Sequence, residues 1–251
     1  MALSSLAPSI GSILKRNLPF DDVRWACAYG SAVFSQKGYK EEDRKKSMVD
    51  LIVAVDDPHT FHKKNLQQNP HHYATLMRNL GANSIVSLQN SGAGIYYNTL
   101  VPIEDRNWKY GVISTERLVR DLQDWDTMYV AGRLHKPVYI IKDEKAYYPP
   151  NLPSIQEAIN KNLNSAVIVA LLLKAVESND LDTFSASGNP RVDISIPELY
   201  ECIAALSYRG DIRFHLRAEN KDKVKNIVKA NEEGFNKLYE PAIKKLLQEN
   251  G

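Results

Sequence analysis

The residues best suited to chemistry begin at Tyr29-Gly30-Ser31, which closes the apolar run Trp25–Tyr29. The run predicts a buried strand, and a glycine at its end lets the backbone approach a ligand closely. A serine hydroxyl and the N–H groups that open a helix are good partners for phosphate oxygens. Apolar residues follow at Ala32, so we expect a helix to start there and Tyr29, Gly30 and Ser31 to bind phosphates.

Asp50 supplies a second element of the same chemistry. It is the only acidic residue in the apolar stretch Met48–Val55, which predicts the next strand. Burying an isolated carboxylate is costly unless a cation accompanies it. We therefore expect Asp50 to hold Mg²⁺ against the phosphates of a bound nucleotide. A Gly-Ser turn and one aspartate occur together in many proteins, so a wider match in the sequence is needed to assign a nucleotide-binding role.

Seven segments give this wider match, in chain order: Ala28–Gln36, Met48–Ile52, His62–Tyr73, Lys109–Val112, Ala131–Val138, Leu206–Arg213 and Lys223–Val228. Together they resemble the mitochondrial phosphatidate cytidylyltransferase family over nearly the whole chain. The resemblance implies transfer of CMP from CTP to phosphatidic acid, which yields CDP-diacylglycerol, a cardiolipin precursor, and pyrophosphate. It also implies Mg²⁺ as cofactor and a peripheral enzyme on the matrix side of the mitochondrial inner membrane, or on a bacterial membrane surface if the source is bacterial.

The fold class expected is mixed α/β (α+β), with a boundary near residue 150. The resemblance implies a polymerase-β-like nucleotidyltransferase domain over residues 1–150 and a smaller, mostly helical, winged-helix-like domain with a C-terminal helix over 151–251. Further strands are expected at Ser84–Leu88, Gly94–Val101, Tyr110–Ile113 and Pro137–Ile141. Helices are expected at Phe61–Leu80, interrupted by Pro70, and at Thr115–Trp125. A further helix follows the capping-box spacing Ser154/Glu157, and another opens at Ser195 and Glu198.

Many polymerase-β-like enzymes carry paired acids as Asp-x-Asp, and this chain departs from that pattern. Residue 52 is Ile52, and Asp56 lies about 20 Å along an extended strand from Asp50. The second metal ligand must then come from a neighbouring strand or from the nucleotide. The phosphate monoester of phosphatidic acid is already ionised near neutral pH, with a second pKa of about 6. We therefore expect catalysis by metal and charge positioning, with little need for a general base.

The remaining candidates carry more than one interpretation. We expect Lys109 to neutralise the triphosphate or pyrophosphate, and the cations Arg133, His135 and Lys136 to bind the nucleotide. Zinc is disfavoured because the histidines lack supporting cysteines and an HExxH spacing. Arg213 either reaches the site or pairs with Asp211 or Glu219. Five polar residues line the site or pack within the core, two interpretations of equal weight: His62, Asn65, Asn69, His72 and Tyr73.

Composition limits the rival functions. A net charge of +2 gives no strong field for nucleic acid, which disfavours a nucleotidyltransferase acting on RNA. A nucleotidyltransferase acting on a small alcohol and a non-enzymatic scaffold for inner-membrane import machinery are the further rival functions. The apolar runs look too short to span a bilayer. We expect the apolar stripe of Phe235–Leu247 to pack on the protein's own core, and the chain to bind vesicles weakly, with phosphatidic acid helping through charge.

Overall fold

The computed structural model describes residues 3–34, 47–143, 152–177, 194–208 and 223–249. The chain forms two compact units. The sheet unit contains Ala2–Asp121 and Val138–Ile155, and the helical unit contains Leu122–Pro137 and Gln156–Gly251. One junction between the units lies at Ile155 and Gln156, and Leu122–Pro137 belongs with the C-terminal helices. The domain boundary near residue 150 stays a prediction.

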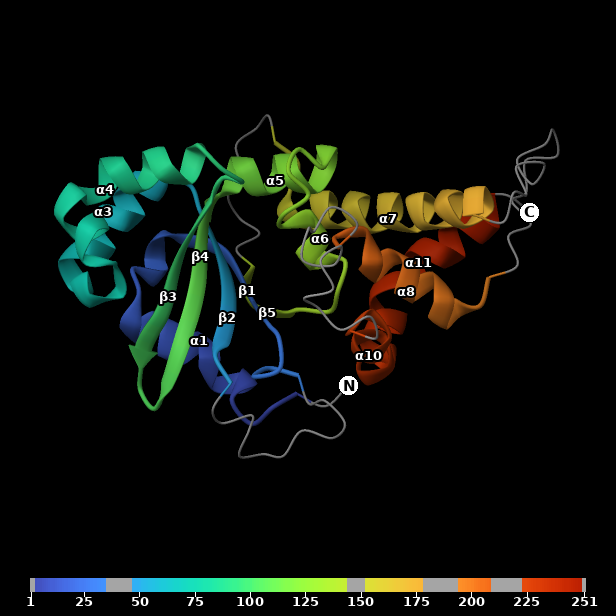
Figure 1. Cartoon of the computed structure of the whole chain (residues 1–251), viewed down its shortest axis with the longest axis horizontal. Coiled ribbons are helices and arrows are strands. Elements are labelled where there is room, and N and C mark those ends of the chain that lie inside the picture. The colour runs from blue at the N-terminus through green and yellow to red at the C-terminus, as the bar shows by residue number, and fades with distance from the viewer. Residues whose placement is uncertain (1–2, 35–46, 144–151, 178–193, 209–222, 250–251) are drawn as a thin grey trace. The chain divides into compact units, whose positions relative to one another are not determined.

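The sheet unit is built on five strands in the order β3-β4-β2-β1-β5 (Figure 1). β1 and β2 pair antiparallel, and β2 and β4 pair parallel. The expected mixed α/β class is confirmed. The bounds of the strands are β1 Val23–Tyr29, β2 Val49–Val55, β3 Ile95–Ile103, β4 Arg106–Ser114 and β5 Tyr139–Asp143.

The two central strands form the core of this unit. In β2, every residue except Asp50 is buried, and β1 has the same pattern with only Arg24 partly exposed. Branched apolar side chains suit a strand that is covered on both faces. Asp50 is therefore the one polar interruption in a central apolar strand, as the sequence indicates.

The helices of the sheet unit are α1 Ala7–Asn17, η1 Phe20–Asp22, α3 Pro58–Gln68, η2 Pro70–His72 and α4 Thr75–Asn90. α5 Thr115–Asp124 begins in this unit and ends in the helical unit. The interruption expected at Pro70 is confirmed, because α3 ends at Gln68 and a 3₁₀ turn begins at Pro70. The strand predicted at Ser84–Leu88 is wrong. Ile85 and Gln89 are both buried, which is the spacing of one helical turn, and the preceding Gly81 kinks the helix at φ +79°.

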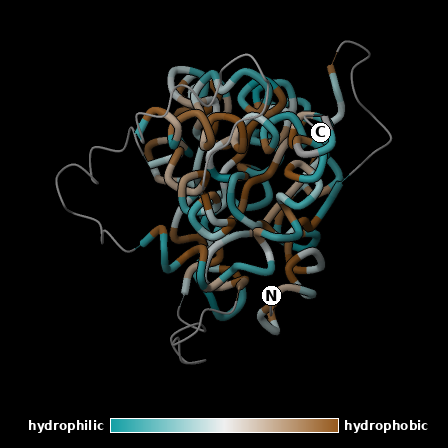
Figure 2. Tube along the Cα trace, turned by 90° about the vertical axis from the view of Figure 1, so that its right-hand side faces the viewer, coloured by the Kyte–Doolittle hydropathy of each residue, from teal (hydrophilic) through white to brown (hydrophobic). Residues whose placement is uncertain are grey.

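The described part of the helical unit contains α6 Ala131–Leu134, α7 Ile155–Glu177, α8 Ile196–Leu206, α10 Lys223–Ala230 and α11 Glu232–Glu249. The helix expected to open at Ser195 and Glu198 is α8, and these two residues form a capping box at its start. Hydrophobic and hydrophilic segments alternate along the trace (Figure 2), as amphipathic helices require. On α11, Phe235 and Tyr239 are fully buried and Ala242 is buried, so this part of the apolar stripe packs inside the protein, whereas Leu238, Ile243 and Leu246 are partly exposed.

α7 revises one expectation about membranes. It is a 23-residue helix, and a window of it with mean hydropathy 1.3 is long and apolar enough to cross a bilayer. The sequence prediction counted only uninterrupted apolar residues and so missed it. The core helix of a soluble protein meets the same criterion, so length and composition alone do not make α7 a membrane span. Ala158, Ala166 and Ala170 are fully buried on α7.

Candidate active site

Strand register brings three of the predicted site residues into one row. Tyr29 on β1 is the cross-strand partner of Asp50 on β2, and Asp50 is in turn the partner of Lys109 on β4. Cross-strand partners project from the same face of a sheet, and neighbouring strands lie about 4.8 Å apart. Three residues from three strands, at positions 29, 50 and 109, thus share one face of the central sheet.

Gly30 turns the chain directly beside the Asp50 carboxylate. A Cβ atom added at Gly30 would lie 3.2 Å from Oδ2 of Asp50, and the backbone of Gly30 has a φ of +87°. That φ lies in the left-handed region, which favours glycine. The N–H groups of Val33 and Phe34 both donate to the Gly30 carbonyl oxygen, at 3.2 and 3.1 Å. The glycine is needed here for both its backbone conformation and its lack of a side chain.

The helix expected to start at Ala32 is not found in the described residues. Residues 31–33 form a turn, and Phe34 makes an isolated bridge to Leu3. Ala32 and Val33 are buried, so their apolar character reflects packing rather than a helix start. Ser31 is half-buried at the open end of β1, and a turn with several backbone N–H groups can still receive an anion.

Lys109 lies across an aromatic ring that the sequence did not single out. Its Nζ is 4.6 Å from the centre of the Tyr97 ring on β3. Gly111 makes this arrangement possible, because a Cβ there would be 2.7 Å from Tyr97 Cε1. Tyr97 and Gly111 are cross-strand partners. Within the part of the chain described, the Lys109 ammonium contacts this ring and no carboxylate, so its charge is available to phosphate oxygens.

Asp56 does not supply the second acid. Arg24 Nε donates to its Oδ2 at 2.6 Å and Thr115 Oγ1 to its Oδ1 at 3.2 Å, at the far end of β2. Among residues 3–34, 47–143 and the described helices, no three His, Cys, Asp or Glu side chains gather as a metal site. A single carboxylate still fits Mg²⁺, which commonly binds one or two carboxylates together with substrate phosphates and water.

Four of the five polar candidates form a buried network on the opposite face of the sheet. Tyr110 follows Lys109 in β4, so its side chain points to the other face. Asn65 Nδ2 donates to the hydroxyls of both Tyr73 and Tyr110, at 2.9 and 2.8 Å. His72 Nδ1 lies 2.9 Å from the Tyr110 hydroxyl, and burial lowers the pKa of His72 to about 4. These contacts match the packing interpretation rather than the site-lining one.

The protonation of His62 follows from its partners. Gln89 Nε2 donates to the carbonyl of Gly94, so its Oε1 accepts, and His62 Nε2 must donate to that oxygen at 3.2 Å. His62 Nδ1 then accepts from the Tyr73 hydroxyl at 2.9 Å. Burial lowers the pKa of His62 to about 4, which keeps the ring neutral at physiological pH.

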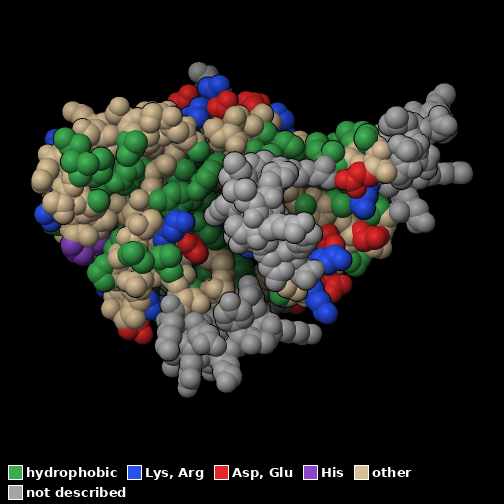
Figure 3. Space-filling model, in the orientation of Figure 1, with side chains coloured by type: hydrophobic (Ala, Val, Ile, Leu, Met, Phe, Trp, Pro, Cys, Tyr) green, Lys and Arg blue, Asp and Glu red, His purple; other side chains and the backbone are tan. Residues whose placement is uncertain are grey.

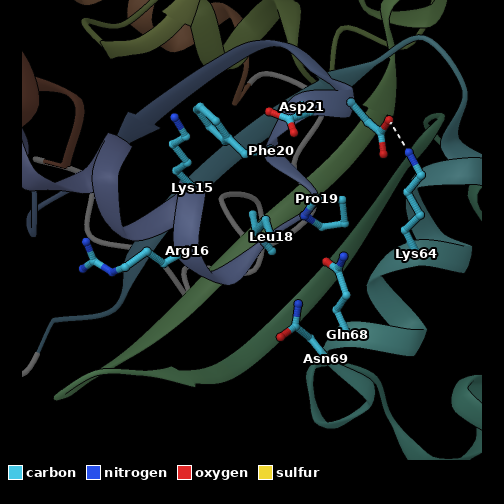
Figure 4. A pocket seen from close by; sticks show the side chains of 10 residues that line it. Lys15, Arg16, Leu18, Pro19, Phe20, Asp21, Lys64, Gln68 and Asn69 are labelled. Carbon is cyan, nitrogen blue, oxygen red and sulfur yellow. Dashed lines mark hydrogen bonds and ion pairs between the residues drawn. The ribbon is translucent and has the colours of Figure 1, made fainter.

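Asn69, the fifth polar candidate, faces a separate pocket (Figure 4). Its Nδ2 donates to Asn65 Oδ1 and to the Asn17 carbonyl, both at 2.9 Å. The pocket has a volume of about 580 Å³, and the Lys64–Asp22 ion pair of 2.7 Å lies at its edge. It holds none of the row Tyr29, Asp50 and Lys109. Its lining residues are Lys15, Arg16, Leu18, Pro19, Phe20, Asp21, Asp22, Lys64, Gln68 and Asn69.

His135 belongs to the helical unit, where Asn162 of α7 organises its surroundings. Asn162 Oδ1 accepts from Trp125 Nε1 at 2.7 Å and lies 3.0 Å from His135 Nε2. Asn162 Nδ2 donates to the Ala131 carbonyl at 3.0 Å, and the Tyr239 hydroxyl donates to the carbonyl of His135 at 2.9 Å. The His135 ring is fully buried. These bonds give it a packing role, and a direct nucleotide contact by this ring stays a prediction.

Lys136 is a buried cation with neutral partners. Only 4% of it is exposed. Its Nζ donates to Ser207 Oγ at 2.7 Å and to the Gly132 carbonyl at 3.3 Å, and lies 4.4 Å from the Tyr208 ring centre. Burial lowers the pKa of Lys136 well below its ordinary value, and the nearby charges of Arg133 and Lys223 lower it further. This concentration of cations suits an anion.

The remaining predicted site residues are Arg133 and Arg213. Arg133 is half-buried on α6 and also belongs to the helical unit, with Lys136. Arg213 lies outside the described residues. Sequence reasoning missed Tyr97 and Gly111, although both lie in segments expected to be strands. Only the register between β3 and β4 reveals that they support Lys109.

The comparisons with known proteins identify the family. Residues 12–250 match the family model described as mitochondrial phosphatidate cytidylyltransferase. The chain belongs to this family. Among its relatives, proteins of that name are 46% identical over 219 residues in Danio rerio, 44% over 232 in Xenopus laevis and 39% over 252 in Homo sapiens.

These matches cover most of the chain but a smaller part of each relative. They span 87%, 91% and 100% of this chain, and 58%, 62% and 49% of the Danio, Xenopus and human proteins respectively. The family match at residues 12–250 includes Gly30, Asp50 and Lys109, which the sheet brings together.

Proposed function

We propose that this chain is a phosphatidate cytidylyltransferase with a polymerase-β-like nucleotidyltransferase fold. It transfers CMP from CTP to phosphatidic acid and releases pyrophosphate. The observation that carries the proposal is the row Tyr29, Asp50 and Lys109 beside the glycine turn at Gly30. Membership of the family named for this activity supports it.

The chemistry assigned to the residues follows from their charges. Backbone N–H groups after Gly30 and the hydroxyl of Ser31 bind phosphate oxygens, and Lys109 neutralises charge on the triphosphate or the leaving pyrophosphate. Asp50 would hold Mg²⁺, which neutralises phosphate charge when it is bound. A phosphate oxygen of phosphatidic acid bonds to the α-phosphorus of CTP while the bond to the β-phosphate oxygen breaks. The electron pair of that bond leaves with pyrophosphate.

No general base is assigned, because the nucleophile is already ionised. The second pKa of a phosphate monoester is about 6, so the attacking oxygen carries charge at neutral pH. This agrees with a site row that contains one carboxylate and one ammonium and no histidine. The histidines His62 and His72 are buried on the other face of the sheet.

We further propose that the protein acts as a peripheral enzyme on the matrix side of the mitochondrial inner membrane. The names of the relatives include the word mitochondrial, and the acceptor is a membrane lipid. Residues Arg133 and Lys136 of the helical unit are proposed to bind phosphate groups of the substrates. Arg133 and Lys223 both lie near the buried ammonium of Lys136, and this grouping of cations supports the assignment.

Pyrophosphate release tests the proposal. We expect release to require CTP and phosphatidic acid together, and to be absent with diacylglycerol, which has the same acyl chains but no phosphate. Equal release with diacylglycerol would contradict a phosphate nucleophile. Release that does not depend on any lipid would indicate simple hydrolysis of CTP.

A further inference from the structure

The segment from Pro58 to Ile103 contains no aspartate or glutamate. These 46 residues form α3, η2, α4 and β3, and they carry three cations, Lys63, Lys64 and Arg78. The whole chain has 30 acidic residues in 251, so a stretch of this length without one is a marked local bias. All of this segment lies within the described part of the structure. We name it the acid-free flank.

The acid-free flank also exposes large apolar side chains. Leu76, Leu80 and Leu88 on α4 are 63%, 53% and 51% exposed. Leu76 and Leu80 are four residues apart in one helical stretch before the kink at Gly81, so they share a face. Figure 3 shows a group of hydrophobic side chains over α4 with no acidic side chain within it. Exposed apolar surface of this kind marks an interaction site.

A bulge extends this surface toward Lys109. Asn98 pairs with Tyr110 and Val101 with Trp108, so Thr99 and Leu100 on the edge strand β3 lie opposite Lys109 alone. Leu100 is 67% exposed and has a φ of +56°, a conformation that is strained for a leucine. The register of the bulge thus places exposed Leu100 opposite a residue of the candidate active site.

We propose that the acid-free flank is the surface by which the protein rests on an anionic bilayer, with the Leu100 bulge bringing the lipid surface beside Lys109. The inference rests on the proposed function in one respect, namely that the acceptor is a lipid. Charge complementarity selects the occupant. The flank has no carboxylate of its own, and although Asp22 pairs with Lys64, its exposed cations Lys63 and Arg78 attract anionic headgroups while its leucines enter the interface. Few charges and few leucines make the association weak and peripheral.

α7 offers the main rival surface. Ile168 and Leu172, 45% and 41% exposed, lie one helical turn apart there. Their exposure and spacing resemble those of Leu76 and Leu80. α7 lacks the charge bias of the flank, because Glu157 lies in its first turn and Glu177 is its last residue. The pair therefore provides a matched control.

Flotation with phosphatidylserine vesicles tests the proposal. Phosphatidylserine is anionic but has no phosphate monoester, so binding reports the surface rather than occupation of the acceptor site. We expect Leu76→Asp/Leu80→Asp to weaken co-flotation by about tenfold or more, because two apolar contacts are lost and negative charge is added. Ile168→Asp/Leu172→Asp should float as the unaltered protein does.

A second variant, Lys63→Glu/Arg78→Glu, reverses charge without touching the core and should also weaken binding to phosphatidylserine. Undiminished flotation of both flank variants would overturn the proposal. Loss of flotation confined to the α7 variant would also overturn it, because α7 would then be the membrane-binding surface. If the leucine variant instead changed only the sedimentation coefficient of the protein, the flank would be a contact between copies.

Activity separates this inference from the proposed function. With phosphatidic acid dispersed in detergent, the Leu76→Asp/Leu80→Asp variant should retain CTP-dependent transfer, whereas with vesicle-borne phosphatidic acid its rate should fall. Flank-dependent flotation without any transfer by the unaltered protein would reject the proposed function and leave the surface assignment intact. Equal rates on vesicles for the variant and the unaltered protein would reject the surface assignment alone.

Discussion

The Asp50 carboxylate lies directly against the backbone of Gly30, with Oδ2 at 3.2 Å from the position that a Cβ would take. A side chain here would meet both a tight contact with this carboxylate and a strained backbone at a φ of +87°, which glycine avoids. The contact joins the end of β1 to the start of β2. It places the expected phosphate-binding turn and the expected metal ligand at one end of the sheet.

Gly30→Ala should weaken CTP binding by about tenfold or more, because the methyl group pushes against the carboxylate and the backbone leaves its left-handed conformation. Calorimetric titration with CTP measures this. Gly92→Ala is the matched control, since Gly92 is exposed and a Cβ there meets nothing within 4 Å. Equal CTP affinity for the Gly30 and Gly92 variants would contradict the phosphate-binding role of the turn.

The sequence is sufficient to predict this pair because each member is marked locally. A glycine closes an apolar run, and a lone acid interrupts another. Tyr97 cannot be predicted in the same way, since its place under Lys109 depends on the register of β3 and β4. The sequence leaves both the site-lining and the packing interpretation open for the network of His62. Polar residues on a helix give the same sequence pattern whether they face a binding site or a buried tyrosine.

Errors in the predicted secondary structure have physical reasons too. Ser84–Leu88 resembles a strand because two branched apolar residues lie between serines, and such short runs do not distinguish strand from helix. Gly81 strengthens the error, since a glycine often ends an element. Here it kinks α4, which continues to Asn90. The grouping of Leu122–Pro137 with the C-terminal helices depends on tertiary contacts such as the Asn162 bonds to Trp125 and Ala131.

Asp50→Asn should abolish turnover and leave the fold intact. Asparagine keeps the size of the side chain but removes the charge that would hold Mg²⁺, so transfer should fall by several orders of magnitude. The thermal unfolding midpoint should change little, because asparagine has the same size and Asp50 is only partly buried. Near-normal activity in this variant would contradict the assignment of Asp50.

Lys136→Met separates a binding role from a packing role. Replacing a buried ammonium that has neutral partners by an apolar chain of similar length should raise the free energy of unfolding by about 1 kcal/mol. The same change should weaken CTP or phosphatidic acid binding if the cation serves the substrates. Denaturant unfolding and calorimetry measure the two effects. A variant that is less stable but binds both substrates normally would show that Lys136 only supports the packing of α6 and α8.

The buried histidines predict a pH dependence of stability. The pKa of His62 is about 4 when folded and about 6.5 when unfolded, so the unfolded chain binds more protons between these values. Stability is therefore lost as the pH falls from about 6.5 toward 4, by about 1–3 kcal/mol for this residue. His62→Gln cannot titrate, and its free energy of unfolding should fall less over this interval. Parallel curves for the two proteins would show that His62 is not held neutral.

The transfer of label from nucleotide to lipid tests the central claim most directly. The protein is incubated with phosphatidic acid vesicles, magnesium and each nucleoside triphosphate labelled at the α-phosphate, and the lipid is then extracted. Among the α-labelled nucleotides, we predict that only CTP transfers label to the lipid phase. CTP labelled at the γ-phosphate should give no label in the lipid. Transfer from α-labelled CTP should also be absent when magnesium is chelated or when Asp50→Asn replaces the unaltered protein. Transfer from another nucleotide at the rate of CTP, or no transfer to lipid from any of them, would contradict the account.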